Sequence, residues 1–444
     1  MSAMPQSEKP RVLIKTLGCK VNHYESLALA EEFRRQGWQV EEQGPFAAVV
    51  VNGCAVTAEA GRQSLQCLRR VRKLYPEACL VLTGCAAMAE SEKALQVENL
   101  GALVGNPGKV SLVSWLTTPR VSSGVPAVFG LSGELGIESL RNLEVTGRTR
   151  AEVKIQDGCN AFCRYCIIPY LRGRCRSLPP AAVLAECRRL AEAGFQEIVL
   201  TGIHIGRYGD DLAEPITLTS LLDFLVQALP EPRLRLGSLQ PHEITPRLIE
   251  LLLDPQTPLC EHLHLSLQAV SDRVLGAMGR PYRLTAITEL FSRLQVGGAR
   301  LAIGTDLIVG FPAETAAAFQ ETLAFIENSD LAYLHVFPYS ARPETVAGAW
   351  PDRVPAAEKK ARAAVLGALG RAKRNHFAET NLGCELEVLL ESRIEHAAYG
   401  PAWFGHSRNY LPVLVRESAQ TAGYQESRRV KVTANFWDGH YLSV

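Results

Sequence analysis

Three cysteines lie within eight positions in the segment DGCNAFCRYCIIP, residues 157–169, with the spacing C-x3-C-x2-C. Thiolates at such short spacing are typical ligands of thiophilic metals and of iron–sulfur clusters. In a [4Fe–4S] cluster, Cys159, Cys163 and Cys166 would leave one iron free for a small-molecule ligand. An open coordination position distinguishes a catalytic metal centre from a structural one. The alternative is a structural zinc site with Cys175 as its fourth ligand.

A second set of three cysteines follows apolar runs near the N-terminus. The segments RVLIKTLGCKVNHYE, AAVVVNGCAVTAEA and ACLVLTGCAAMAES each place Gly-Cys between a short β-rich run and a helical stretch. Alternating strands and helices predict a parallel α/β sheet, in which the carboxyl ends of the strands share one edge. We therefore expect Cys19, Cys54 and Cys85 to converge at that edge.

A longer alternation of strands and helices begins at about residue 150. The expected strands are AEVKIQ, EIVLTG, RLRLGS, HLHLSL, RLAIGTDLIVGF and LAYLHVFPYS. Six β/α units predict a partial or full barrel of parallel strands, with the active site at the C-terminal strand ends. Polar or small residues at those ends are candidates for the lining of the site, and the alternative is that they have turn or capping roles. The candidates are Gly202, His204, Ser238, Gln268, Asp306 and Tyr339.

The remaining segments are a connector and a tail. Residues 105–148 contain Gly-, Ser- and Pro-rich stretches and are predicted to connect the first domain to the second. Three β-rich runs at the C-terminus predict a small antiparallel β-barrel. In this tail Arg408 lies near Tyr410, and cations interspersed with aromatic rings suit stacking on unpaired RNA bases. The alternative is a solvated face beside a small core.

Composition narrows the functional classes. The chain has 444 residues, of which 47% are hydrophobic and 21% charged, and its net charge is +1. No overall field favours nucleic acid or membrane, so any polyanion site must be a local patch. Without a transmembrane run or the apolar core of a signal peptide, we expect a cytoplasmic protein with no membrane contact. Twelve cysteines in a reducing compartment indicate metal or redox chemistry.

The segment CNAFCRYC resembles the cluster loop of the radical S-adenosylmethionine (SAM) enzymes. Together with LGCKVN, VNGCAVT and LTGCAA, it is similar to the methylthiotransferase family over nearly the whole chain. The resemblance implies an α/β fold with three domains. These are an N-terminal parallel α/β domain (10–122), a radical SAM barrel (145–374) and a small antiparallel β-barrel of the RNA-binding TRAM type (376–444).

The resemblance also implies two [4Fe–4S] clusters and SAM as cofactors. The triplet Cys159, Cys163 and Cys166 would hold the cluster whose open iron binds SAM, and one-electron reduction would cleave SAM to a 5′-deoxyadenosyl radical. The N-terminal cysteine triplet would hold the auxiliary cluster, which carries the sulfur to be transferred. SAM would also supply the methyl group. The partners implied are a tRNA substrate and a one-electron donor such as flavodoxin or ferredoxin.

Further contacts to SAM are expected in the barrel. We expect Tyr165 to face the adenine, and Gly202 and His204 to lie near the methionine amino group. Gln268 and Asp306 are candidates for the ribose or the methionine. For Tyr165 and His204, simple packing is the alternative.

Small differences indicate the branch of the family. The segments LGCKVN, LHLSLQ and LHVFPYS resemble the branch that methylthiolates C2 of N6-threonylcarbamoyladenosine beside the anticodon of tRNA. The alternatives are the branches that act on isopentenyladenosine in tRNA or on an aspartate of a small-subunit ribosomal protein. A further alternative is that the protein is not an enzyme but an iron–sulfur protein with an RNA-binding or sensing role. Ala269, Val270 and Glu344 depart from the usual family residues.

Overall fold

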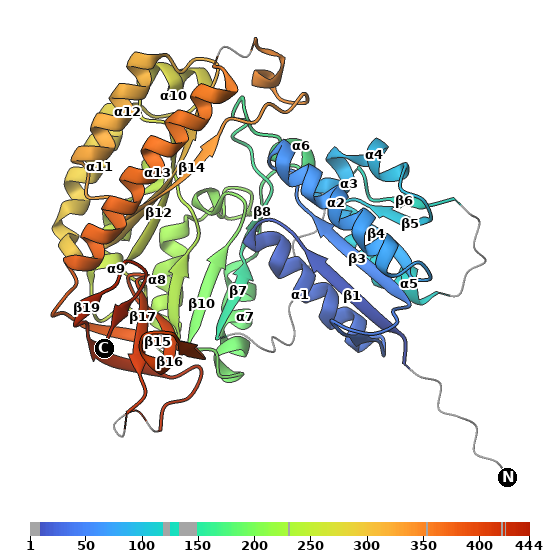
Figure 1. Ribbon diagram of the computed structural model, residues 1–444, viewed down its shortest axis with the longest axis horizontal. Coiled ribbons are helices and arrows are strands. Elements are labelled where there is room, and N and C mark those ends of the chain that lie inside the picture. The colour runs from blue at the N-terminus through green and yellow to red at the C-terminus, as the bar shows by residue number, and fades with distance from the viewer. Residues whose placement is uncertain are drawn as a thin grey trace.

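The computed structural model describes residues 9–118, 125–132, 149–229, 231–351, 354–418, 421 and 423–444. Figure 1 shows an N-terminal α/β domain in blue and cyan, a central barrel from green to orange, and a C-terminal sheet in red. The C-terminal sheet lies under the barrel, and the N-terminal domain lies beside it. Every helix in these ranges is too short or too polar to cross a bilayer.

The N-terminal domain is built on one six-stranded sheet whose strand pairs are all parallel. The strand order is β2 (Gln39–Val40), β1 (Arg11–Thr16), β3 (Ala48–Gly53), β4 (Cys79–Gly84), β5 (Leu100–Val104) and β6 (Ala127–Phe129). The helices are α1 (Lys20–Arg35), α2 (Ala58–Leu74), α3 (Cys85–Ala89), α4 (Ser91–Leu95) and α5 (Lys109–Thr117).

Alternating side chains on the strands explain why helices cover both faces of this sheet. Val12 packs in one core cluster with side chains of α1 and α5, whereas the next residue, Leu13, packs in another with α2 and α3. Successive strand residues point to opposite faces, so a strand that is apolar throughout needs a helix layer on each side. The sequence-based expectation of a parallel α/β domain is confirmed.

The predicted connector is shorter than expected. Residues 109–117 form α5, and β6 pairs in parallel with β5, so both belong to the first domain. The predicted domain end at residue 122 is therefore too early, because the sheet continues to Phe129. The other Gly-, Ser- and Pro-rich parts of the connector, residues 119–124 and 133–148, lie outside the described residues.

The central domain is a partial barrel. Its six strands are those expected from the sequence: β7 (Arg150–Lys154), β10 (Glu197–Thr201), β11 (Arg233–Leu236), β12 (His262–Gln268), β13 (Ala302–Val309) and β14 (Tyr333–Pro338). They form two parallel three-stranded sheets, β7-β10-β11 and β12-β13-β14. Isolated parallel bridges at Leu234–Leu259 and Leu239–Leu265 join the two sheets. Within the described residues β7 and β14 do not pair, so the barrel is open on one side.

Helices surround the outside of this barrel. They are α7 (Pro180–Glu192), α8 (Leu218–Ala228), α9 (Pro246–Leu253), α10 (Asp272–Met278), α11 (Leu284–Leu294), α12 (Ala316–Asn328) and α13 (Ala356–Glu379). Short 3-10 helices cover Asn106–Gly108, Ile205–Arg207, Pro241–Glu243, Gln295–Arg300 and Val346–Ala349. The loop after β7 holds β8 (Gln156–Asp157), α6 (Ile168–Arg172) and β9 (Arg176–Ser177).

The barrel interior is polar because strand residues alternate between helices and lumen. Leu263, Leu265 and Leu267 of β12 belong to the core shared with the outer helices. His262 and His264, at the alternate positions, face Tyr333 of β14. Gly304 of β13 leaves room for the Tyr333 ring, since a Cβ at this position would lie 2.0 Å from a ring carbon.

The C-terminal sheet departs from a purely antiparallel barrel. Its order is β18 (Arg429–Thr433), β15 (Glu385–His396), β16 (Gly400–Ser407), β17 (Pro412–Arg416), β20 (Leu442–Ser443) and β19 (Phe436–Trp437). The pair β17–β20 is parallel, and the others are antiparallel. The expectation of a small β-rich C-terminal domain is confirmed. Its strand pairing is mixed and not purely antiparallel, because β20 runs in the same direction as β17.

Candidate functional site

The three N-terminal cysteines lie at one edge of the sheet. Cys19 precedes α1, Cys54 follows β3, and Cys85 is the first residue of α3. Because β1, β3 and β4 are parallel neighbours, their carboxyl ends bring these positions together. The structure therefore confirms the predicted convergence.

Two observations show how closely these thiols approach. A Cβ at Gly18 would lie 2.6 Å from the Cβ and 2.8 Å from the Sγ of Cys54. Burial raises the pKa of the Cys54 thiol to about 11, and the nearby Cys85 and Cys19 thiols act in the same direction. The side-chain amide of Asn106 also donates to Cys85 Sγ at 3.7 Å. The pocket therefore brings thiols and an amide donor together, which suits a thiophilic metal that binds several thiolates.

The second triplet lies on the loop between β8 and α6. The Cys159 amide donates to the carbonyl of Gly173 at 3.0 Å, which closes the loop, and the Cys166 amide donates to the Cys163 carbonyl at 2.9 Å. Burial raises the pKa of the Cys166 thiol to about 12, and the Cys163 and Cys159 thiols also raise it. The three sulfurs therefore face a common space.

His204 interacts directly with this triplet. Its Nδ1 lies 3.4 Å from Cys159 Sγ, and its Nε2 lies 2.6 Å from Glu243 Oε1. Burial alone would raise the pKa of the Cys159 thiol, but the hydrogen bond and charge of His204, the Ala161 amide and the Arg280 charge together lower it. The sequence placed His204 beside the cofactor, and the structure places it beside a cysteine.

Arg280 is a site residue that the sequence reasoning missed. Its side chain is buried and donates to Cys163 Sγ at 3.4 Å and to the Ser266 carbonyl at 2.6 Å. A guanidinium beside a thiolate offsets negative charge through a charge-assisted hydrogen bond. In the sequence, only the position of Arg280 in the segment GRPY after α10 could have drawn attention to it. Its distance along the chain from the cysteine loop gives no indication that the two meet.

A buried group of charges joins the two cysteine sets. Arg172, at the end of α6, lies 2.9 Å from Glu25 of α1 and 3.2 Å from Asp157 beside the cysteine loop. Lys154 lies 3.1 Å from both carboxylates, and Lys109 also pairs with Glu25. These contacts hold α1, which begins at the first cysteine, against the loop of the second triplet.

The cysteine geometry distinguishes a cluster from a single ion. Four ligands around zinc at about 2.3 Å place their sulfurs about 3.8 Å apart. Neither triplet has its three sulfurs all within 4.8 Å of one another. A [4Fe–4S] cluster spreads its ligand sulfurs more widely, because each one binds a different iron. The two sets of three thiols therefore suit two such clusters better than a single four-coordinate zinc ion.

The residues predicted to contact SAM lie around the second triplet and the barrel. The half-buried Tyr165 packs edge-on against Phe311, with ring centroids 6.5 Å apart. Gly202 packs against the Gln156 carbonyl, which a Cβ would approach to 2.7 Å. Gln268 ends β12 with φ of 65°, a left-handed conformation that is strained for this residue type and typical of functional sites.

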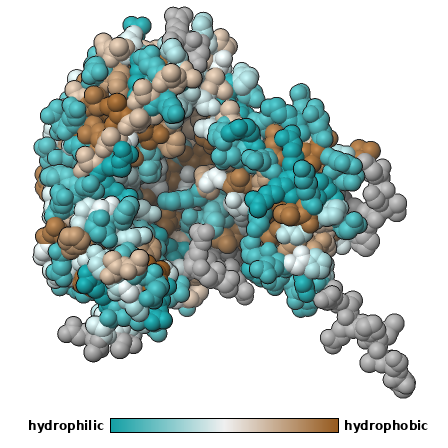
Figure 2. Space-filling model, in the orientation of Figure 1, coloured by the Kyte–Doolittle hydropathy of each residue, from teal (hydrophilic) through white to brown (hydrophobic). Residues whose placement is uncertain are grey.

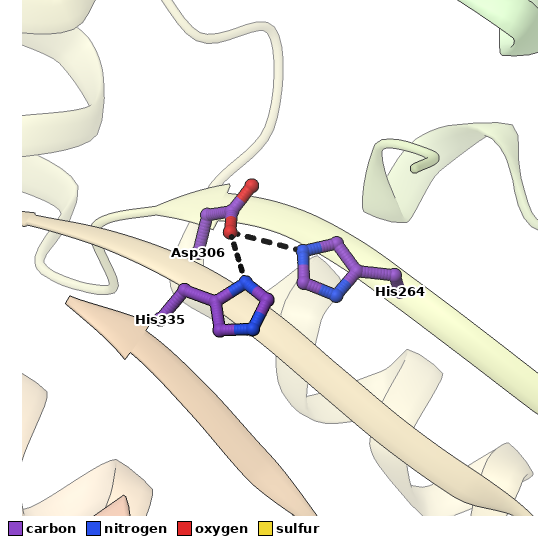
Figure 3. Close-up of side chains that lie close together, drawn as sticks. All are labelled: His264, Asp306 and His335. Carbon is purple, nitrogen blue, oxygen red and sulfur yellow. Dashed lines mark hydrogen bonds and ion pairs between the residues drawn. The ribbon is translucent and has the colours of Figure 1, made fainter. Parts of the chain in front are cut away.

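Asp306 is the centre of a polar group in the barrel (Figure 3). Its Oδ1 lies 3.0 Å from His264 and 3.2 Å from His335, and these hydrogen bonds outweigh burial to lower the Asp306 pKa to about 2. The Tyr333 hydroxyl bridges His262 at 2.7 Å and His264 at 3.0 Å. The spacing of the three side chains would suit a divalent cation, but Oδ1 of the carboxylate already accepts hydrogen bonds from both imidazoles. A contact from Asp306 to SAM stays a prediction.

Arg408 lies in a different environment from the one predicted. Its guanidinium pairs with Glu261 at 2.8 Å and donates to the carbonyls of Thr257 and Leu259, at 3.0 and 2.6 Å. These contacts dock the C-terminal sheet on the barrel. They use the donors of Arg408 within the protein, and its contact with RNA bases stays a prediction.

Tyr410 lines a pocket of about 450 Å³ where the three domains meet. Its ring stacks on His406, with centroids 4.8 Å apart, and the Arg235 guanidinium lies 4.8 Å from its centroid. Figure 2 shows the surface hollowed between the barrel and the N-terminal domain. Tyr410, one of the two predicted RNA contacts, thus lies at a cavity.

Known proteins are similar to this chain over most of its length. The threonylcarbamoyladenosine tRNA methylthiotransferase MtaB of Bacillus subtilis is 34% identical over 93% of this chain and 92% of its own. The chain belongs to the radical SAM methylthiotransferase family. Other family members of similar length include the ribosomal protein uS12 methylthiotransferase RimO of Desulforudis audaxviator, which is 32% identical over 90% of this chain and 89% of its own.

Domain models and solved structures agree with this membership. Residues 11–105 match the model described as uncharacterized protein family UPF0004, and residues 153–326 match the radical SAM superfamily. The radical SAM methyltransferase TsrM from Kitasatospora setae superposes with a TM-score of 0.57 over 77% of both chains, at 15% identity. At that identity the likeness shows the fold alone. This methylthiotransferase is thus a radical SAM enzyme that uses [4Fe–4S] clusters and SAM.

Proposed function

We propose that this methylthiotransferase acts on C2 of N6-threonylcarbamoyladenosine beside the anticodon of tRNA. The observation that carries the proposal is the pair of three-cysteine sets, held together by buried charges between the first two domains. Five relatives named as threonylcarbamoyladenosine tRNA methylthiotransferases, 32–34% identical, support the choice of substrate. Relatives named for dimethylallyladenosine reach 31 and 34%, so overall identity does not separate the branches.

In this proposal the two triplets have separate roles. Cys159, Cys163 and Cys166 hold the cluster that binds SAM, and Cys19, Cys54 and Cys85 hold the auxiliary cluster. When bound, these groups supply the radical that removes hydrogen from the adenine and the methylthio group that replaces it.

Three side chains of the protein form hydrogen bonds with cysteine sulfurs of the two sets. Arg280 donates to Cys163, the ring of His204 contacts Cys159, and Asn106 donates to Cys85. Hydrogen bonds to thiolate sulfur offset its negative charge and orient the ligand. Tyr165, Gly202, Gln268 and Asp306 remain the proposed SAM contacts around them.

The domain division belongs to the same proposal. The first domain would extend to Phe129, the barrel would cover 145–374, and the RNA-binding TRAM-type domain would cover 376–444. Tyr410 is the proposed RNA contact of the last domain. The proposal also includes a flavodoxin- or ferredoxin-type electron donor and a cytoplasmic location, where tRNA is available.

The test is methylthiolation in vitro, with anaerobically reconstituted protein, SAM, a reductant and an anticodon stem-loop. We expect the methylthio product, by nucleoside mass spectrometry, from RNA with threonylcarbamoyladenosine. The Cys19→Ala variant should lose the product and about half of the iron, since one cluster in two loses a ligand. The matched control is Cys384→Ala, which changes an exposed cysteine outside both triplets.

Two outcomes would contradict the proposal. Product on isopentenyladenosine RNA or on the ribosomal protein, but not on threonylcarbamoyladenosine RNA, would assign another branch. A reduced cluster whose electron paramagnetic resonance spectrum is unchanged by SAM would favour a sensing or RNA-binding role without catalysis.

A further inference from the structure

The pocket of about 450 Å³ takes side chains from all three domains. α1 contributes Lys20, the residue after Cys19, and the C-terminal sheet contributes Phe404 and Tyr410. The barrel contributes β7, β10 and β11 through Arg150, Glu152, Val199 and Arg235. A base that enters this pocket therefore lies beside the start of α1, where the auxiliary cysteines converge.

Most charges around the pocket already have partners. Arg150 pairs with Glu391 at 3.0 Å, and Arg235 pairs with Glu197 at 2.7 Å. Glu152 lies 2.9 Å from the imidazole of His23. The charges within each of these pairs cancel. Glu426 also lines the pocket and has no ion pair among the described residues.

Lys20 is the exception among the cations that line the pocket. In the part of the chain that the structure describes, its ammonium group has no ion pair and no side-chain hydrogen bond. The charge of Lys20 nonetheless acts on a residue inside the barrel, His262. Burial lowers the pKa of His262 well below its ordinary value, and the charges of Arg235 and Lys20 act in the same direction. Among the described residues that line the pocket, Lys20 is thus the one cation, and Glu426 the one carboxylate, that has no ion pair within the protein.

We propose that this pocket receives the N6 substituent of the substrate adenine and that Lys20 pairs with the carboxylate of that substituent. The inference rests on the proposed function, because a threonylcarbamoyl group carries one carboxylate, one hydroxyl and polar N–H and C=O groups. A single free ammonium matches that single negative charge. A charge-assisted hydrogen bond of this kind is about twice as strong as a neutral one.

The same pocket selects against uncharged substituents. An alkenyl group on N6 would displace water from Lys20 and give it no partner in return. Lys20 is exposed in the free protein, and a substituent in the pocket would cover it. A polar site rejects a ligand that lacks the matching group more strongly than an apolar site rejects a small change, because the polar groups that the ligand covers are left unpaired. Lys20 is therefore a specificity-determining residue.

Tyr410 gives the pocket a rigid wall. Its backbone has φ of 66°, and its ring is held between His406 and Arg235. The Ser392 hydroxyl and the Glu152 carboxylate lie in the same lining and offer partners for the threonine hydroxyl and the carbamoyl N–H groups. The substituent is thereby held by all three domains.

The test compares two RNAs with two proteins. The RNAs are an anticodon stem-loop with threonylcarbamoyladenosine and the same stem-loop with the threonine carboxylate converted to an amide. Wild type should bind the carboxylate form about 10- to 100-fold more tightly, the range for a hydrogen bond between charged groups. Lys20→Met should lose this preference by weakening binding of the carboxylate form only.

The matched control is Lys73→Met, which removes the same charge from the exposed last turn of α2. It should keep the full preference, and Lys20→Arg should keep most of it. Iron content is measured for each protein, so that a lost cluster is not mistaken for lost recognition.

The outcomes separate the inference from the proposed function. If wild type binds both RNAs equally, or if Lys20→Met weakens both equally, the inference is wrong. This result would leave the proposed function standing as long as wild type still methylthiolates threonylcarbamoyladenosine RNA. If wild type forms no such product, the proposed function itself fails.

Discussion

At the scale of single residues, the backbone at Gly18 decides whether the auxiliary thiols can meet. Gly18 has φ of 103°, and its missing side chain leaves room for the Cys54 side chain. A conformation in this region favours glycine whatever the surroundings. At Gly18 the lack of space adds a second reason, because a Cβ would collide with the Cβ and Sγ of a proposed ligand.

Gly18→Ala and Gly37→Ala separate these two reasons. Gly37 also has positive φ, of 83°, but no atom lies within 4 Å of the position of its Cβ. We expect Gly37→Ala to lower the free energy of unfolding by about 1 kcal/mol and to keep its iron. Gly18→Ala should also lose up to half of its iron, measured by iron and sulfide analysis after reconstitution. Equal iron in the two variants would contradict the role of Gly18.

At the scale of elements, α1 and α6 are held together by charges that are almost fully buried. The group contains two carboxylates, Glu25 and Asp157, and three cations, Lys109, Lys154 and Arg172. Burial opposes ionisation of Glu25, but Arg172, Lys109 and Lys154 hold its pKa well below the ordinary value. The extra cation matches the negative charge that thiolates bring, since the Cys85 thiol is among the groups that raise the pKa of Arg172.

Arg172→Met tests the role of this buried group. Removing one partner from a buried ion pair typically costs about 3–5 kcal/mol, because the other charge stays buried without compensation. We expect a loss of this size in urea unfolding, with faster proteolysis between the first two domains. Arg62→Met is the control, because Arg62 pairs with Glu59 at the surface and should change stability by less than about 1 kcal/mol. A similar small loss in both variants would show that the buried group is not essential.

At the scale of the whole molecule, a buried charged group around Glu197 is one of the contacts between the barrel and the C-terminal sheet. Arg235 pairs with Glu197 and also donates to the Arg408 carbonyl at 2.9 Å. Arg233 pairs with the same Glu197 and donates to the Glu387 carbonyl at 3.3 Å. The carboxylate of Glu197 thus offsets the charge of both arginines, and both arginines donate hydrogen bonds to backbone carbonyls of the C-terminal domain.

The stability of this contact should depend on pH. Burial opposes ionisation of Glu197, but Arg235 and Arg233 lower its pKa below the ordinary value. The unfolded chain therefore binds the proton more tightly, and the stabilisation present above about pH 4.3 is lost as the pH falls through the folded pKa.

Glu197→Gln isolates this contribution. At neutral pH we expect the variant to be about 3–5 kcal/mol less stable, because its arginines stay buried without a carboxylate. Below about pH 4 the difference should shrink by up to about 1.4 kcal/mol per pH unit. Urea unfolding of both proteins across this range measures it, with the exposed Glu59→Gln as control. A gap that stays constant with pH would contradict the linkage.

Much of the architecture was available from the sequence, because it follows from local patterns. Strand and helix periods predicted the N-terminal sheet and all six barrel strands. Gly-Cys after three parallel strands was enough to bring Cys19, Cys54 and Cys85 to one edge. The Gly-, Ser- and Pro-rich composition of residues 105–148 led to the wrong prediction that the whole segment is a connector. Composition does not reveal that β6 pairs with β5.

The sequence by itself determined the two cysteine sets, their chemistry and the fold that presents them, since spacing and periodicity are local properties. Only the tertiary structure decided which distant groups meet them. It placed Arg280 beside Cys163, paired Arg408 with Glu261, and left Lys20 with no ion pair among the described residues in a pocket that three domains share. Such contacts depend on how domains pack, and packing joins residues whose separation along the chain carries no information about their distance.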